Sequence, residues 1–162
     1  MIKIKKLPTS RWKDYRNLRL DALRKDSISF SSSYEEEKKL LDSEWKRRTR
    51  NTLFALSDDK PIGMIAYVFN KKSKIRHIAN IFGFYVKESY RNQGVGRKLI
   101  ESALSSIMRN EYIIKIDLTV NPKQTSAVRL YKKFGFRVVG VMKRDLFVNG
   151  KFYDGLIMEK FL

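Results

Sequence analysis

The sequence contains no cysteine and only one histidine, His77, among its 162 residues. The lack of cysteine excludes disulfides, thiol nucleophiles and cysteine-based zinc or iron–sulfur sites. One histidine cannot form a paired His motif, so we expect no metal site and interpret His77 as structural or exposed. No apolar run approaches the ~20 residues of a membrane span, and the alternating apolar and basic residues of Met1–Lys6 do not resemble a signal peptide. We therefore expect a cytoplasmic protein with no membrane partner.

Acidic residues are also scarce. The chain has 17 Asp and Glu against 35 Lys and Arg, which gives a formal net charge of +18, and both halves of the chain are positive. Such a surface attracts polyanions, and it is compatible with proximity to nucleic acid or the ribosome or with a phosphorylated cofactor. A basic proteome or a working pH that favours lysine explains the same charge. The chain has no zinc-finger, RRM or clear helix-turn-helix signature that would favour a nucleic-acid module.

The residues that are present are sufficient for one folded domain spanning residues 1–162. Apolar residues make up 43% of the chain and aromatic residues 12%, which is enough for a core at this length. Periodicity, caps and turn signals predict strands over 2–5, 52–57, 62–69, 75–86, 112–120, 136–148 and 152–161, with helices from 12, over 33–50, over 94–110 and over 126–134. This order predicts an α/β fold with a mostly antiparallel, twisted sheet of about seven strands, flanked by about four helices, with one strand–helix–strand crossover.

A glycine-bearing loop joins the strand ending at Val86 to the helix that begins at Gly94. The first turn of a helix leaves backbone N–H groups unpaired at the positive end of the helix dipole, so an anion such as pyrophosphate binds there readily. Gly94 and Gly96 permit close approach of a ligand and positive φ angles. A packing glycine at a helix entry is the plainer interpretation of the same pattern. The loop matches neither a Walker motif nor a dinucleotide fingerprint, because Leu99 holds the third glycine position.

Two longer motifs carry a resemblance to a known family. The stretch Tyr90–Leu99, read as YRNQGVGRKL, matches the Arg/Gln-x-x-Gly-x-Gly/Ala signature of the GNAT superfamily of N-acetyltransferases. The stretch Ala127–Phe136, read as AVRLYKKFGF, resembles the family's Ala-x-x-Leu-Tyr-x-x-x-Gly-Phe motif. Weaker similarities are found at Gly150–Asp154 and over Phe30–Glu37. The resemblance covers nearly the whole chain.

The resemblance implies that acetyl-CoA binds in a notch where two neighbouring strands splay apart. The strand ending at Val86 would pair with the pantetheine arm, and the N–H of Val86 would point at the thioester oxygen. Asn92–Arg97 would surround the pyrophosphate, with Lys98 and Lys132 as further candidates for phosphate contacts. The full set of expected cofactor-binding residues is Phe84, Tyr85, Val86, Arg91, Asn92, Gln93, Gly94, Val95, Gly96, Arg97, Lys98, Asn121, Gln124, Ala127, Tyr131 and Lys133.

Tyr131 matches the family's proton donor to the departing thiolate. A phenol with a pKa near ~10 can donate to a thiolate whose conjugate acid has a pKa near ~8.5. The family often has Asn seven residues before this tyrosine, where this chain has Gln124, with Asn121 three residues earlier. Either amide could contact the cofactor.

The general base is missing from its usual place. Many relatives use a Glu at the strand position that corresponds here to Thr119, which cannot accept a proton. Asp117, two residues earlier on the same strand face, is the candidate base, and a water relay with no dedicated base is the alternative. For the acceptor site, the resemblance and the charge pattern indicate Phe30, Glu35 and Asp154.

We therefore predict an acetyl-CoA-dependent N-acetyltransferase that transfers the acetyl group directly to a primary amine. The absence of cysteine agrees with direct transfer, because no thiol can carry the acetyl group. The acceptor is a small amine or a protein N-terminus or lysine. The alternative is a non-catalytic CoA-binding or nucleic-acid-associated protein on the same fold. A homodimer is compatible with the sequence.

Overall fold

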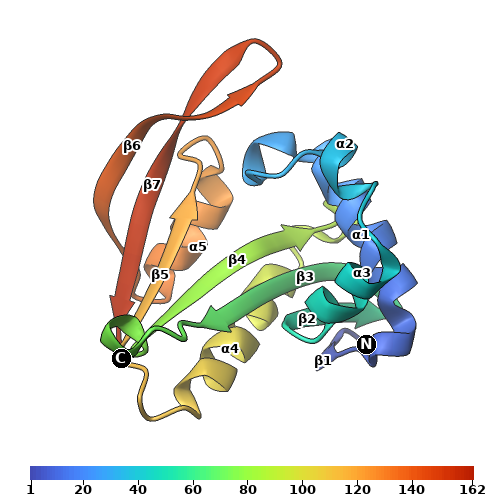
Figure 1. The fold of residues 1–162 in the computed structure, drawn as a ribbon, viewed down its shortest axis with the longest axis horizontal. Helices are drawn as coiled ribbons and strands as arrows, with labels where there is room; N and C mark the ends of the chain where they lie inside the picture. The colour runs from blue at the N-terminus through green and yellow to red at the C-terminus, as the bar shows by residue number, and fades with distance from the viewer.

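The computed structural model describes residues 1–162 and contains one seven-stranded sheet (Figure 1). The strands are ordered β1-β2-β3-β4-β5-β7-β6, and every neighbouring pair is antiparallel except β4 and β5. The predicted mostly antiparallel sheet is thus confirmed. The strands are β1 (Lys3–Lys6), β2 (Thr52–Ser57), β3 (Lys60–Phe69), β4 (Ile78–Val86), β5 (Lys115–Val120), β6 (Arg137–Val148) and β7 (Lys151–Phe161).

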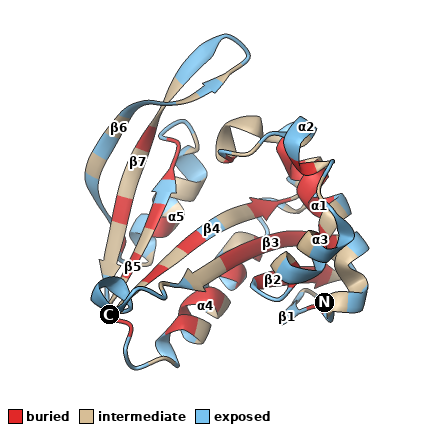
Figure 2. Cartoon of the chain, viewed as in Figure 1, coloured by how far each residue is buried: buried red, intermediate tan, exposed pale blue.

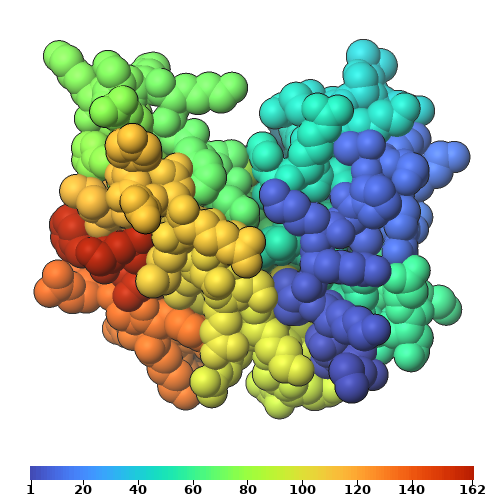
Figure 3. Space-filling model, turned by 90° about the horizontal axis from the view of Figure 1, so that it is seen from below, coloured from blue at the N-terminus to red at the C-terminus, as the bar shows by residue number.

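Five α-helices cover the two faces of the sheet: α1 (Trp12–Lys25), α2 (Tyr34–Glu37), α3 (Asp42–Thr49), α4 (Val95–Met108) and α5 (Thr125–Lys133). Helices α1 and α3 pack on one face, and α4 and α5 pack on the other. The space-filling view from below shows α4, in yellow, lying across the middle of its face between the blue N-terminal segment and the orange and red C-terminal segments (Figure 3). None of these helices is both long enough and apolar enough to cross a lipid bilayer.

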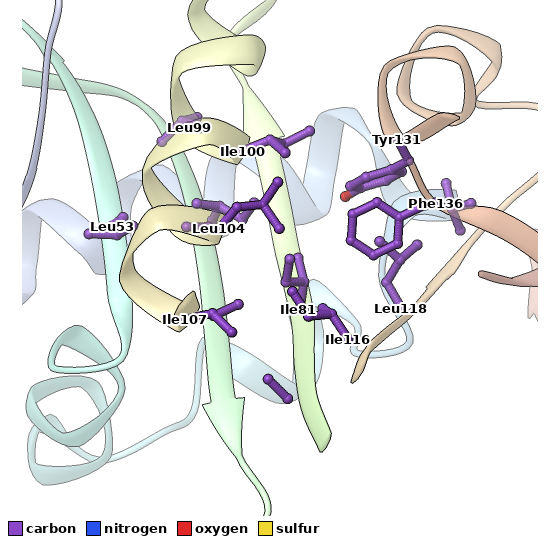
Figure 4. Packing of buried hydrophobic residues seen from close by; sticks show 14 of the residues in the cluster. Leu53, Ile81, Leu99, Ile100, Leu104, Ile107, Ile116, Leu118, Tyr131 and Phe136 are labelled. Carbon is purple, nitrogen blue, oxygen red and sulfur yellow. The ribbon is translucent and has the colours of Figure 1, made fainter. Parts of the chain in front are cut away.

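The core consists of two apolar clusters, one on each face of the sheet, and buried residues follow the inner strands and the inward faces of α1 and α4 (Figure 2). The larger cluster packs α4 against the sheet, because α4 places an apolar residue toward the strands at each helical turn (Figure 4). The smaller cluster surrounds Trp45, which is fully buried. Tyr15 contacts it edge-on, with ring centroids 5.4 Å apart. These clusters fix the strands that form the notch described below.

The helix predicted over 33–50 is two helices. The capping box at Ser33 and Glu36 is present, but α2 ends at Glu37 and α3 begins only at Asp42. Leu41, between the two helices, has extended backbone angles and is 75% exposed. The break lies beside Glu37, whose buried carboxylate is bonded to Arg19 of α1. This tertiary contact is not encoded in the helical pattern.

Two strands begin three residues later than predicted, β4 at Ile78 and β5 at Lys115. Residues 73–75 form a 3-10 turn instead. The N–H groups of Ile114 and Lys115 both donate to the carbonyl of His77, which starts the parallel pair. His77 therefore lies at this strand junction, partly exposed.

Strands β4 and β5 separate soon after they pair. Their parallel register contains three pairs and ends at Asn80 and Asp117. Beyond these residues β4 continues to Val86 and β5 to Val120 with no bonds between the strands. A bulge in β4 at Gly83, which has φ of +64°, bends the strand at the same level. The predicted splayed strands are present, and they open a notch toward the start of α4.

Candidate functional site

Two cavities meet at the separated strands. The notch cavity, of about 620 Å³, lies among the end of β4, the start of α4 and the β5–α5 loop. The sheet-face cavity, of about 690 Å³, lies on the opposite sheet face, below α1 and the loop of residues 28–32 and beside β6 and β7. Ile28 lines both cavities. A ligand in the notch therefore reaches the edge of the second cavity.

The N-terminus of α4 opens into the notch cavity without a side-chain cap. Gly94 is its N-cap, with φ of +78°, and no side chain accepts a hydrogen bond from the first turn. A β-carbon at Gly94 would meet nothing within 4 Å, so the backbone angle rather than crowding favours glycine there. The N–H groups of the first turn are consequently free to bind an anion.

Gly96, two residues further on, is required for a different reason. A β-carbon built on it would lie 3.0 Å from Cζ of Phe84 and 3.3 Å from Cδ2 of Leu130. The absence of a side chain thus lets α4 approach β4 and α5 closely. This packing sets the width of the notch where the helix begins.

Positive charge surrounds this helix start. Asp26 is the single acidic residue that lines the notch cavity, and the basic residues lining it are Arg91, Arg97, Lys123, Arg129 and Lys133. Arg91 is held in place by two bonds: Nε donates to the carbonyl of Val86 at 2.9 Å, and Nη2 donates to Asp26 at 3.1 Å. An uncapped helix with a net positive rim is suited to a polyphosphate.

The backbone of Val86 faces the notch. Lys87 donates its N–H to the carbonyl of Ile62 on β3, at 2.8 Å. Because successive residues of a strand turn their peptide groups to opposite edges, the N–H and carbonyl of Val86 turn away from β3, toward the gap left by β5. The bond from Arg91 to the Val86 carbonyl agrees with this direction.

Tyr131 lies behind the notch, at the base of α5. Its ring is 4% exposed and packs against Phe84 and Phe136, with centroid separations of 5.8 and 5.6 Å. Its hydroxyl end points toward β4 (Figure 4), it has no hydrogen-bond partner, and burial is the sole influence on its pKa. Burial raises the pKa of Tyr131 well above its ordinary value, so the hydroxyl keeps its proton at neutral pH.

The two amides near α5 have different surroundings. Gln124 donates its side-chain amide to the hydroxyl of Ser29, which joins the β5–α5 loop to the loop after α1. Asn121 is 5% exposed, and its Oδ1 accepts the N–H of Lys123 at 2.9 Å. The Nδ2 of Asn121 is buried without a partner. Asn121 therefore has the free donor.

One end of the sheet-face cavity, toward α1 and α3, is basic. Arg19 donates two hydrogen bonds of 2.9 Å to the carboxylate of Glu37, and Arg48 lies 3.1 Å from the same carboxylate. Burial acts to raise the pKa of Glu37, but the two guanidinium groups outweigh it and the pKa is lowered. Phe30 stacks on the guanidinium of Arg19, 4.4 Å from its ring centroid. Arg47 also lines this end.

The other end, formed by β5, β6 and β7, is acidic. It is lined by Asp117, Asp145 and Asp154. The ammonium of Lys115 lies 3.2 Å from Asp117 but is not aligned for a hydrogen bond. The backbone N–H of Arg144 and the ammonium of Lys143 bond to Asp154 and lower its pKa.

Comparison with known proteins identifies the family. The sequence model of the acetyltransferase (GNAT) family matches residues 12–136. The chain belongs to the GNAT family of acetyltransferases. It is 26% identical over 124 residues to the L-amino acid N-acetyltransferase AaaT of Escherichia coli, covering 74% of this chain and 76% of that protein.

Solved structures share the fold over the full length. A GNAT-family acetyltransferase from Streptococcus pneumoniae superposes with a TM-score of 0.88 at 24% identity, covering 100% of both chains. The yncA protein of Salmonella typhimurium, solved with its cofactor acetyl-CoA, superposes with a TM-score of 0.81 at 14% identity, covering 100% of this chain and 94% of that one. These structures confirm the predicted GNAT fold, and the family match confirms the predicted acetyltransferase.

In this acetyltransferase, most of the predicted cofactor residues lie around the notch cavity, and five do not line it. Gln93 bonds to the carbonyl of Ser89, Val95 is a core residue at 1% exposure, and Lys98 points into solvent. Asn121 lines the sheet-face cavity instead, and Tyr131 packs against Phe84, which does line the notch cavity. The residues that do line it are Phe84, Tyr85, Val86, Arg91, Asn92, Gly94, Gly96, Arg97, Gln124, Ala127 and Lys133.

Three cavity-lining residues were not predicted from the sequence: Lys123, Arg129 and Asp145. Lys123 precedes the second motif and Arg129 lies within it, and their positive charge near the start of α5 was the available signal. Among the acceptor-site candidates, Phe30 and Asp154 line the sheet-face cavity. Glu35 does not, because its side chain is 68% exposed and pairs with Lys38, while Glu37 of the same turn points inward.

Proposed function

We propose that this acetyltransferase transfers the acetyl group of acetyl-CoA directly to the primary amine of a small zwitterionic acceptor of the amino-acid type. The observation that carries the proposal is the charge separation within the sheet-face cavity. Its α1–α3 end contributes Arg19, Arg47 and Arg48. Only Glu37 and Glu44 neutralise these three groups, which leaves one excess positive charge for an acceptor carboxylate.

The residues present fit the phosphates of acetyl-CoA. The first-turn N–H groups of α4 would bind the pyrophosphate, and Arg97, Lys123 and Lys133 would supply charge around it. The buried, unpartnered Nδ2 of Asn121 would donate to the pantetheine arm. When bound, acetyl-CoA supplies an activated acetyl group and a thiolate leaving group.

Two groups of the chain would act on the reaction. The N–H of Val86 faces the gap between the strands and would donate to the acetyl carbonyl oxygen, where negative charge develops. Tyr131 retains its proton and would donate it to the leaving sulfur. Asp117, the base suggested by the sequence, already has the ammonium of Lys115 beside it.

The relative AaaT, named as an L-amino acid N-acetyltransferase, supports an amino-acid acceptor. A protein N-terminus is the alternative, and it lacks the free carboxylate that the basic end of the cavity would bind. The family match favours an enzyme over a non-catalytic CoA-binding protein.

The test compares matched acceptors by CoA release. L-Amino acids should be acetylated with at least tenfold higher kcat/KM than their carboxamides, since one charge-assisted hydrogen bond is worth about 1.5–3 kcal/mol. Arg47→Gln, at a residue that lines the basic end, should reduce this preference. Equal rates for acids, amides and short peptides would contradict the amino-acid acceptor.

Binding of acetyl-CoA is tested separately by calorimetry, using Gly94→Asp against Gly94→Asn. Both side chains tolerate the positive φ angle of Gly94, and only Asp adds negative charge beside the phosphates. We expect at least a tenfold weaker Kd for Gly94→Asp and a much smaller change for Gly94→Asn.

A further inference from the structure

Strand β6 contains a bulge that directs Asp145 into the sheet-face cavity. Its register with β7 passes from Met142 opposite Gly155 to Leu146 opposite Tyr153, so three residues of β6 oppose one of β7. Arg144, in the middle of the bulge, has φ of +54°. Such a backbone angle in a residue other than glycine is uncommon and needs support from its surroundings.

Asp154, the residue of β7 opposite the bulge, supplies that support. Its Oδ1 accepts the backbone N–H of Arg144 at 3.0 Å, and its Oδ2 accepts Nζ of Lys143 at 2.9 Å. The bulge is therefore held on both sides by one carboxylate. Asp154, one of the acceptor-site candidates from the sequence, therefore stabilises the bulge, and both of its carboxylate oxygens are already bonded.

The bulge places the carboxylate of Asp145 over Gly155, next to Thr119. A β-carbon built on Gly155 would lie 2.7 Å from Oδ2 of Asp145 and 3.1 Å from Cγ2 of Thr119. The absence of a side chain at Gly155 is what leaves room for the carboxylate. Thr119 is two residues past the last β4–β5 pair, so it stands where the notch opens.

Asp145 is also the one unpaired carboxylate of this cavity. Glu37 is bonded to Arg19 and Arg48. Asp117 lies against Lys115, and Asp154 is bonded to the bulge. Asp145 forms neither an ion pair nor a hydrogen bond, although it lines the cavity.

We infer that Asp145 receives the acceptor amine and takes its proton during acetyl transfer. The inference rests on the proposed function. The neutral amine would donate an N–H to the carboxylate, which directs its lone pair toward the notch. As nitrogen bonds to the acetyl carbon it becomes positive and releases a proton to Asp145, while the carbon–sulfur bond breaks and the sulfur leaves as a thiolate. The thiolate takes a proton from Tyr131, and the proton on Asp145 passes through solvent to restore Tyr131, so protons balance.

The carboxylate of Asp145 thus lies beside Thr119. Thr119 is the β5 position at which many relatives have a Glu and this sequence has no carboxylate. The side chain of Asp145 extends from β6 over Gly155 of β7, so its carboxylate reaches this position on β5. A carboxylate that accepts a proton from a reacting group contributes typically 10²–10⁴-fold to a rate.

The experiment compares Asp145→Asn with wild type, with Asp58→Asn as the matched control. Asp58 is in the β2–β3 turn, has a positive φ that Asn tolerates, and forms no bond in the structure. The probe is the best acceptor found among the L-amino acids and simple primary amines. Two readouts are taken: kcat/KM for that acceptor, and its binding by calorimetry to protein saturated with CoA, where no transfer occurs.

For Asp145→Asn we expect about a 100-fold loss of kcat/KM and at least a fivefold loss of acceptor affinity, with the Kd for acetyl-CoA unchanged. Gly155→Ala should reproduce part of the loss, because its methyl group displaces the Asp145 carboxylate. Values for Asp145→Asn within threefold of wild type in both readouts would overturn the inference while leaving the transferase activity intact. Failure of wild type to acetylate any amine would instead overturn the proposed function, and the inference with it.

Discussion

The ring of Phe84 lies against the α-carbon of Gly96, so close that a β-carbon there would be 3.0 Å from Cζ. The same ring packs on Tyr131. Phe84 of β4 thus contacts both Gly96, in the first turn of α4, and Tyr131 of α5. The position of α4 relative to the splayed strand depends on this contact.

Gly96→Ala should therefore lower both stability and cofactor affinity. Phe84 packs on Tyr131, and Cδ2 of Leu130 lies 3.3 Å from the same β-carbon, so the added methyl group must move α4, at a cost of about 1–3 kcal/mol. Thermal denaturation and acetyl-CoA calorimetry measure the two effects. Gly140→Ala is the control, because its β-carbon would make only an ordinary contact of 3.4 Å with Ile157. If both variants behaved alike, the close packing at Gly96 would not determine the width of the notch.

Tyr131→Phe should reduce turnover without loss of stability. The hydroxyl has no hydrogen-bond partner, so its removal breaks no hydrogen bond, while loss of a proton donor costs typically about 10²-fold in rate. The measurements are kcat and the melting temperature, with Tyr112→Phe, at an exposed residue, as control.

The raised pKa of Tyr131 adds an expectation about pH. Because the hydroxyl keeps its proton beyond the ordinary tyrosine range, wild-type kcat should show no decline from tyrosine ionisation between pH 7 and about pH 10. A decline in that interval that is absent from Tyr131→Phe would contradict the buried, protonated state.

The order of elements and the glycine-bearing loop before α4 could be predicted from sequence because both depend on local patterns. Gly94 and Gly96 stand out as part of the longer Tyr90–Leu99 motif, and Asn149 and Gly150, which both have positive φ, form the turn of the last hairpin. Asp145 could not be found in this way. Its direction depends on a bulge stabilised by a residue on the neighbouring strand, and no periodic pattern encodes that.

The acidic run at residues 35–37 shows the same limit. The sequence favours Glu35 for the acceptor site, yet tertiary contact with Arg19 and Arg48 draws Glu37 inward and leaves Glu35 exposed. Which of three adjacent carboxylates faces the interior depends on cations from two other helices.

The expectations of proximity to nucleic acid or the ribosome and of a homodimer remain predictions.

Glu37→Gln should destabilise the protein strongly. The change leaves Arg19 and Arg48 beside each other without the carboxylate that pairs them, and breaking a buried ion pair from one side costs about 3–5 kcal/mol. Glu35→Gln, in the same turn and exposed, should change stability little. Urea denaturation of the two variants measures the difference.

The stabilisation from Glu37 should also depend on pH in a defined direction. Its pKa is lowered in the folded protein, so its contribution is fully present above the ordinary glutamate pKa of ~4.3 and is lost as the pH falls through the folded value. The stability gap between wild type and Glu37→Gln should therefore be constant from pH 6 to 8 and narrow below about pH 4. A gap that widened on acidification would show that Glu37 is not held as a carboxylate.

Asn121→Ser should weaken acetyl-CoA binding more than Gln124→Ser does. Serine at position 121 can still accept the N–H of Lys123, as short polar side chains do two residues ahead, but it loses the buried Nδ2 donor. The loss of one hydrogen bond to the pantetheine arm corresponds to about 1 kcal/mol, or roughly fivefold in Kd. The amide of Gln124 is already bonded to Ser29, so Gln124→Ser should alter acceptor KM, through the loop after α1, rather than cofactor Kd. Calorimetry with CoA and acetyl-CoA separates the two variants, and the reverse order of effects would assign the cofactor contact to Gln124.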